Sequence, residues 1–137
     1  MIFMKSFLDI DPTAAAPIWR QIEDGMRRLV ASGRLPEGTP VPSVRELSKS
    51  LRVNPATVSK AYRLLTEAGL LEVRRGEGTF VAEMPPQARA AERERLLEDG
   101  ARRFVMVART IGASRKEASR AVEAMWKKTN QGGEGKD

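Results

Sequence analysis

Two helix start signals stand eleven residues apart in the middle of the chain, and this spacing limits the fold more than any other feature of the sequence. Residues 43–46, Ser-Val-Arg-Glu, form a capping-box pattern, in which the serine oxygen accepts one backbone N–H and the glutamate side chain accepts another. Asn54 and Pro55 form the second signal, because asparagine caps helices well and proline suits the first helical position. We therefore expect two short helices joined by a turn of about three residues.

A further amphipathic helix is predicted ahead of this pair, over residues 17–32, where apolar side chains recur at spacings of three and four. Pro17 suits its first turn, and Gly33 is a favourable stop. The same spacing predicts that the second helix of the pair, residues 55–68, buries one face and ends at Gly69. The apolar positions are Ile18, Ile22, Met26 and Leu29 in the first helix, and Val58, Ala61, Leu65 and Ala68 in the other.

A β-hairpin is expected directly after the paired helices. Residues 71–74 alternate in polarity, residues 76–78 read Gly-Glu-Gly, and residues 79–81 have the composition of a second short strand. Arg74 and Arg75 stand beside the turn. The pattern therefore predicts a two-stranded wing whose tip is approached by basic side chains.

The last third of the chain has the pattern of a helical arm. After the break at Pro85 and Pro86, apolar residues recur at alternating spacings of three and four along a long helix, and a second capping box at residues 114–117 opens a last helix. A wing domain of about 70 residues already has its own core, so we expect the arm to form a homodimer. The expected dimerisation residues are Leu97, Gly100, Phe104, Val107, Ile111, Val122 and Met125.

Taken together, these elements predict a mainly α fold with a small β-wing: a winged helix-turn-helix followed by two C-terminal helices forming a dimerisation arm. We expect the winged helix-turn-helix over residues 1–82, the arm over residues 83–128, and a disordered Gly-rich tail over residues 129–137. A helix fits the major groove of DNA, and small or polar outward side chains let it approach the base edges. The expected DNA-binding residues are Ser43, Arg45, Lys49, Asn54, Pro55, Ala56, Thr57, Ser59, Lys60, Arg63, Arg75 and Gly76.

Composition narrows the function classes. The 137 residues include no cysteine and no histidine, which excludes disulfides and thiolate metal sites and removes the usual general base. We therefore expect a protein without catalytic activity, metal or cofactor. The net charge of +6 and pI of about 10.2 favour an anionic partner such as double-stranded DNA. No apolar run approaches the ~20 residues that cross a bilayer, so we expect a cytoplasmic protein, at the bacterial nucleoid, with no membrane partner.

Several ordered blocks of the chain resemble the GntR family of bacterial transcriptional regulators. They are residues 32–38 (SGRLPEG), 41–47 (VPSVREL), 53–58 (VNPATV), 68–71 (AGLL) and 75–81 (RGEGTFV). The resemblance covers roughly residues 11 to 82 and implies DNA contacts from Arg45, from residues 54–57 with Ser59, and from Arg75 with Gly76. The sequence departs from the family pattern at Arg52, where glycine is frequent in the bend, and at Ala56, where a polar residue is more usual.

The short region after the wing resembles the YtrA-like subgroup, as do residues 10–12 (IDP) and 17–22 (PIWRQI). This resemblance implies dimerisation through two C-terminal helices, and it implies control of an operon encoding an ABC transporter. Trp19 and Trp126 are interpreted as core or interface residues in preference to the lining of a ligand pocket.

Three function hypotheses remain at this point. The main one is a homodimeric regulator, more specifically a repressor, that reads a two-fold symmetric operator. The alternative is a winged helix whose basic face binds an acidic protein instead of DNA. The weakest is a carboxylate-dependent hydrolase using Glu67, Glu72 and Glu77, because these residues are scattered in the sequence with no metal-ligand spacing. An unknown small-molecule effector is a further candidate partner, at the joint marked by Pro85 and Pro86.

Overall fold

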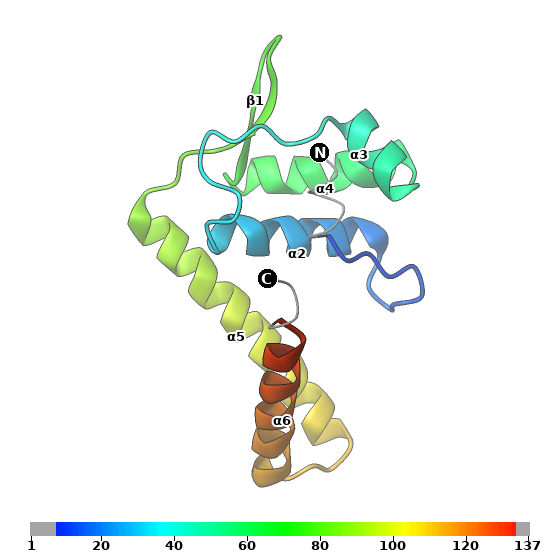
Figure 1. Ribbon diagram of the computed structural model, residues 1–137, viewed down its shortest axis with the longest axis vertical. Helices are drawn as coiled ribbons and strands as arrows, with labels where there is room; N and C mark the ends of the chain where they lie inside the picture. The colour runs from blue at the N-terminus through cyan, green and yellow to red at the C-terminus, as the bar shows by residue number, and fades with distance from the viewer. Residues whose placement is uncertain (1–7, 134–137) are drawn as a thin grey trace. The chain divides into compact units, whose positions relative to one another are not determined.

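The computed structural model describes residues 8–133, so the first seven residues of the expected wing domain and the last four of the expected tail lie outside the described residues. The elements follow the predicted order (Figure 1). They are α2 (Ile18–Ala31), α3 (Val44–Leu51), α4 (Pro55–Glu67), β1 (Leu71–Arg74), β2 (Gly78–Val81), α5 (Pro86–Thr110) and α6 (Arg115–Gly133).

The core of the first part of the chain lies between α2, α3 and α4. Ile22 and Met26 of α2 and Val58 and Leu65 of α4 are fully buried, as is Leu47 of α3. Figure 1 shows α2 and α4 side by side, with α3 at one end of α4. Burying each of these large apolar side chains contributes about 1.5–3 kcal/mol, so the predicted apolar faces hold the three helices together.

Both predicted helix starts are confirmed. The Ser43 Oγ accepts from the Glu46 backbone N–H at 3.0 Å, and a Glu46 carboxylate oxygen accepts from the Ser43 N–H at 3.3 Å. Asn54 caps α4 through its Oδ1, which accepts from the Ala56 N–H at 2.9 Å. Between them Arg52 adopts the left-handed conformation, with φ at 58°. The turn that joins α3 and α4 therefore contains an arginine in a backbone conformation that glycine adopts more readily.

The prediction that Ala68 is buried is wrong, because this residue is exposed at the end of α4. Gly69, with φ at 82°, reverses the chain in a Schellman motif, in which the Leu70 N–H donates to the Leu65 carbonyl and the Gly69 N–H to the Thr66 carbonyl. The reversal brings Leu70 into the core, where it is fully buried, and leaves Ala68 outside. The start of α2 differs from the prediction by one residue, because Pro17 is the N-cap and Ile18 is the first helical residue.

The predicted hairpin is present, with Leu71 opposite Val81 and Arg74 opposite Gly78, so that the second strand begins at Gly78, one residue earlier than expected. A segment before α3 runs along its second strand: the Val81 N–H donates to the Thr39 carbonyl at 2.8 Å, and the Val41 N–H donates to the Thr79 carbonyl at 2.9 Å. The base of the wing is therefore fastened to the loop that leads into α3.

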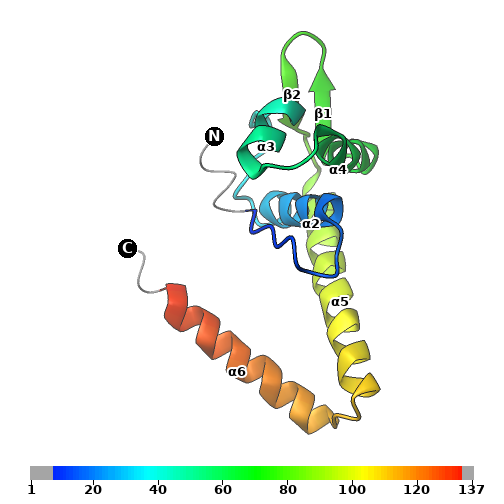
Figure 2. The same cartoon turned by 90° about the vertical axis from the view of Figure 1, so that its right-hand side faces the viewer.

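The chain divides into two compact units between Glu94 and Arg95, inside α5. This division lies beyond residue 82, where the domain boundary was expected. Two ion pairs hold the first turns of α5 to this unit. Arg89 pairs with Glu37 at 2.6 Å, and Glu92 pairs with Arg27 at 2.8 Å. Within the second unit, Figure 2 shows α6 diverging from α5 after the intervening turn.

The expectation of disorder from Thr129 is wrong for residues 129–133, which continue α6. The Thr129 hydroxyl donates to the carbonyls of Met125 and Trp126, both at 3.0 Å, and extending a helix that already exists costs little. At the other end of α6, the predicted cap is present, since the Ser114 Oγ accepts from the Glu117 N–H at 3.1 Å. In the described part of the chain, no helix combines the length and the apolar character needed to cross a membrane.

Candidate nucleic-acid interface

The predicted interface residues are carried by α3, α4 and the wing, and nearly all of them are exposed. Thr57 is half-buried. The exposed members are Ser43, Arg45, Lys49, Asn54, Pro55, Ala56, Ser59, Lys60, Arg63, Arg75 and Gly76. The hydrophobic faces of α3 and α4 are turned into the core, so these polar and small side chains are left on the solvent side.

The two arginines of the wing, Arg74 and Arg75, have different surroundings. Arg74 pairs with Glu72 at 2.8 Å, and its guanidinium lies 4.1 Å from the centre of the Phe80 ring. Arg75 lies in the turn at the tip of the hairpin, and its side chain is exposed. The next residue, Gly76, has a φ of 78°. The tip is closed by the Glu77 N–H, which donates to the Arg74 carbonyl at 2.9 Å. Arg75 is therefore the arginine that lies in the turn, outside both strands of the hairpin.

The outward face of α4 carries two cations with different surroundings. Arg63 approaches Glu67 at 3.9 Å, one turn further along the same helix. Lys60 lies over an aromatic ring of another helix, with its Nζ 4.2 Å from the centre of the Trp19 ring. Trp19 is half-buried on the first turn of α2, which agrees with its interpretation as a packing residue.

Tyr62, which is not among the residues predicted from the sequence, joins α4 to the loop before α3. Its hydroxyl donates to the Pro42 carbonyl at 2.6 Å, and the side chain is buried. Burial, with a smaller effect of the Glu46 charge, raises the pKa of Tyr62 well above its ordinary value. The signal that would have found it is its position four residues after Val58, on the buried face of α4.

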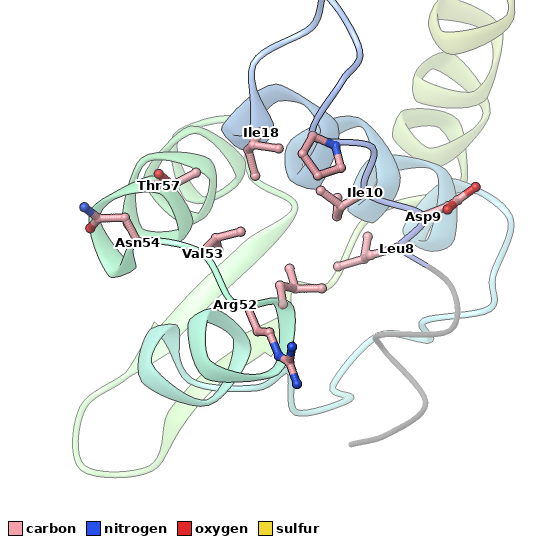
Figure 3. Close-up of a pocket in the computed structure, with 10 residues that line it drawn as sticks. Leu8, Asp9, Ile10, Ile18, Arg52, Val53, Asn54 and Thr57 are labelled. Atoms are coloured by element: carbon pink, nitrogen blue, oxygen red, sulfur yellow. The ribbon is translucent and has the colours of Figure 1, made fainter.

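A hollow of about 670 Å³ lies beside the helix-turn-helix bend (Figure 3). Figure 3 shows Leu8, Ile10 and Val53 turned toward one another, whereas the polar ends of Arg52 and Asn54 point outward. The lining is therefore mostly apolar. Among the residues that the structure describes, no group of three or more acidic side chains could hold a metal ion.

Two of the three carboxylates of the hydrolase hypothesis are paired with arginines. Glu67 lies beside Arg63, and Glu72 is paired with Arg74. Each of these two carboxylates thus lies beside an arginine of its own helix or strand.

Comparison with known proteins decides the family. The model of the gntR family of bacterial regulatory proteins matches residues 19–81. The HTH-type transcriptional regulator Rv1152 of Mycobacterium tuberculosis is 33% identical over 117 residues, which cover 85% of this chain and 92% of that protein. The chain belongs to the GntR family.

Two other similarities are informative for this GntR protein. It is 43% identical over 76 residues to the HTH-type transcriptional repressor YtrA of Bacillus subtilis, a match that covers 56% of this chain and 58% of that relative's length. A solved structure of a GntR family transcriptional regulator from Listeria monocytogenes has a TM-score of 0.69 at 24% identity, over 84% of this chain and 98% of that one. The second match confirms the winged helix fold with its helical C-terminal region. Relatives of this GntR protein are thus named as transcriptional regulators, not as enzymes.

The second unit of this GntR protein contains an apolar hollow of about 880 Å³ between α5 and α6. Four of the predicted dimerisation residues line it: Leu97, Gly100, Phe104 and Val122. Val107, Ile111 and Met125 are also exposed but are not part of this lining. Part of the predicted apolar seam therefore lines this hollow, and the rest is exposed outside it.

Proposed function

We propose that this chain is a sequence-specific DNA-binding transcriptional regulator that binds a two-fold symmetric operator as a homodimer. The observation that carries the proposal is the grouping of exposed cations on α3, α4 and the wing of one compact unit, with Arg75 held at the hairpin tip. Phosphate charge supplies most of the affinity of proteins for DNA, and arginine is the side chain that best reads guanine edges and narrow minor grooves.

In this proposal α4 enters the major groove with its N-terminal turn toward the bases. Ala56 permits close approach to a thymine methyl group, and Ser59 contacts bases or phosphates. Arg45, at the first turn of α3, contacts a phosphate or a guanine, while Arg75 enters the adjacent minor groove. Ser43 and Asn54 already accept backbone N–H groups as caps, so each contributes to DNA binding through its remaining donor atoms.

The homodimer is proposed to form through the second unit. Its exposed apolar side chains include Leu97, Phe104 and Val107, and an exposed apolar surface of this kind is typical of a protein interface. Two copies related by a two-fold axis would place two α4 helices on half-sites about one helical turn apart. An operator with two-fold symmetry follows from this arrangement.

The direction of regulation and its setting are proposed from the relatives. YtrA of Bacillus subtilis is named a transcriptional repressor, and we propose repression for this chain as well. The family resemblance further suggests an operon that encodes a transporter, with the regulator at the nucleoid. A small-molecule effector is kept in the proposal, and its test is calorimetry with candidate metabolites combined with operator binding.

The deciding experiment is selection of duplexes from a random pool with the purified full chain. Enrichment of a two-fold symmetric sequence is the expected result. For ~6 to 10 neutralised phosphates, affinity should also fall by ~10³ to 10⁵ between about 50 and 200 mM salt. An unenriched pool together with a flat salt response would refute DNA binding, and capture of an acidic protein under the same conditions would then favour the protein-interaction alternative.

A further inference from the structure

Trp19 and Lys60 bring α2 into contact with the outward face of α4. The Lys60 Nζ lies 4.2 Å from the centre of the Trp19 ring, and an ammonium group above an indole face is the most favourable cation–π arrangement. Lys60 is exposed, whereas Trp19 is half-buried on a helix that packs against α4. The flexible lysine is therefore held by a comparatively rigid ring at one edge of the proposed interface.

The charge environment of Lys60 differs from that of the other cation on this face of α4. Arg63 has the Glu67 carboxylate nearby, which compensates part of its charge. Within residues 8–133, none of the ion pairs involves Lys60, and the first turns of α2 and α4 carry no acidic side chain. An aromatic ring orients an ammonium group without neutralising it, so the full positive charge of Lys60 stays available to an anion.

We propose that Trp19 is a positioning residue for DNA binding, which holds the Lys60 ammonium in place for contact with a backbone phosphate beside the major groove. This inference rests on the proposed function. Holding a long side chain in one conformation before binding reduces the entropy lost when the contact forms. The first turn of α2 thereby becomes an edge of the DNA interface, outside the three elements that the sequence motifs single out.

Phosphate contact makes a specific prediction about salt. A lysine that neutralises one phosphate contributes about 0.9 to the slope of log affinity against log salt, and it does so on any duplex sequence. A cation–π pair that only links α2 to α4 would instead change the unfolding temperature and leave the salt slope unchanged. The salt slope therefore separates a positioning role from a merely structural one.

The test uses the full chain with two probes: the duplex enriched by selection and a random-sequence duplex of equal length. The variants are Lys60→Ala, Trp19→Leu, which removes the ring, and Trp19→Phe, which keeps an aromatic face. Lys116→Ala, an exposed lysine on α6, is the matched control. Dissociation constants are measured between about 50 and 200 mM salt, and thermal unfolding is recorded for each variant.

Lys60→Ala should lower the salt slope by about 0.9 per bound protomer and weaken binding to both duplexes about 3- to 10-fold. Trp19→Leu should weaken binding in the same direction, Trp19→Phe should restore most of it, and the double variant Trp19→Leu with Lys60→Ala should bind no worse than Lys60→Ala alone. Lys116→Ala should bind like the wild type.

Wild-type slope and affinity in Trp19→Leu, or in Lys60→Ala, would overturn the inference, even if the unfolding temperature of that variant falls. If the wild type binds the selected duplex and Arg75→Ala loses that binding, such a result leaves the proposed function standing. A wild-type chain that binds neither duplex overturns both proposals at once.

Discussion

Arg27 of α2 donates through Nη1 to a carboxylate oxygen of Glu92 of α5 at 2.8 Å, and their side chains are only 12% and 8% exposed. The same guanidinium pairs with Glu23 at 3.0 Å. Burial alone disfavours the charged guanidinium, but the hydrogen bonds that it donates to Glu92 and Glu23 outweigh this effect and hold the pKa of Arg27 above its ordinary value. This network attaches the start of α5 to the winged unit.

Glu92→Ala should therefore lower the free energy of unfolding of the chain by about 1–3 kcal/mol, because it leaves a mostly buried guanidinium short of one partner. The measurement is urea denaturation. Glu98→Ala is the control, since its ion pair with Arg102 is exposed on both sides and should be worth less than about 1 kcal/mol. Equal losses in the two variants would show that burial of the Arg27 pair does not matter.

Arg45→Ala and Arg75→Ala should each weaken binding to the selected duplex by about 1–3 kcal/mol without changing the unfolding temperature. Both side chains are exposed, so their loss removes no core packing. Arg28→Ala, an exposed arginine of α2, serves as the control in the same gel-shift titration. Wild-type affinity in both interface variants would contradict the proposed contacts.

Arg52→Gly should raise the unfolding temperature of the chain, because Arg52 occupies the left-handed region, with φ at 58°. A left-handed conformation costs a residue with a Cβ about 1 kcal/mol, and glycine adopts it readily. Arg52→Val should lower the temperature, since a β-branched side chain is strained most at positive φ. The prediction fails if the two variants shift the unfolding transition in the same direction.

Phe104→Asp should convert the proposed dimer to a monomer in sedimentation velocity, because it puts a charge in the apolar hollow between α5 and α6. Val73→Asp is the matched control, since Val73 is a highly exposed apolar residue of the wing, remote in sequence from that hollow. A Phe104→Asp chain that sediments like the wild type would argue against this surface as the dimer contact.

The free energy of unfolding should fall as the pH rises above about 10, because Tyr62, the single tyrosine of the chain, then ionises in the unfolded state. The pKa of Tyr62 is raised in the folded state by burial, so the unfolded chain releases the phenolic proton at a pH where the folded chain still holds it. The stabilising effect of the neutral phenol is thus complete below the unfolded pKa and is lost as the pH rises toward the folded pKa.

Absorbance of the phenolate at 295 nm follows this one group directly. We expect no phenolate in the folded chain at a pH near the ordinary tyrosine pKa. At higher pH the phenolate should appear together with the loss of the helix signal in circular dichroism. Ionisation at the ordinary pKa with the helices intact would contradict the burial of Tyr62 and its hydrogen bond to Pro42.

The sequence by itself determined the helix-turn-helix and the wing, because the signals for them act over a few residues. A serine cap reaches the N–H three positions ahead, an asparagine cap reaches two ahead, and a glycine at positive φ closes a turn next to itself. The exposure of Arg45 and Arg75 followed in the same way, from the side of a helix or turn opposite its apolar residues.

Tertiary structure alone decided the contacts between distant segments. Tyr62 meets Pro42 across 20 positions, and Arg27 meets Glu92 across 65. The Lys60 ammonium finds the Trp19 ring only because α2 and α4 pack side by side. The packing of the apolar faces decides which polar side chains meet over such separations in the sequence. The periodicity of a single helix contains no information about that packing.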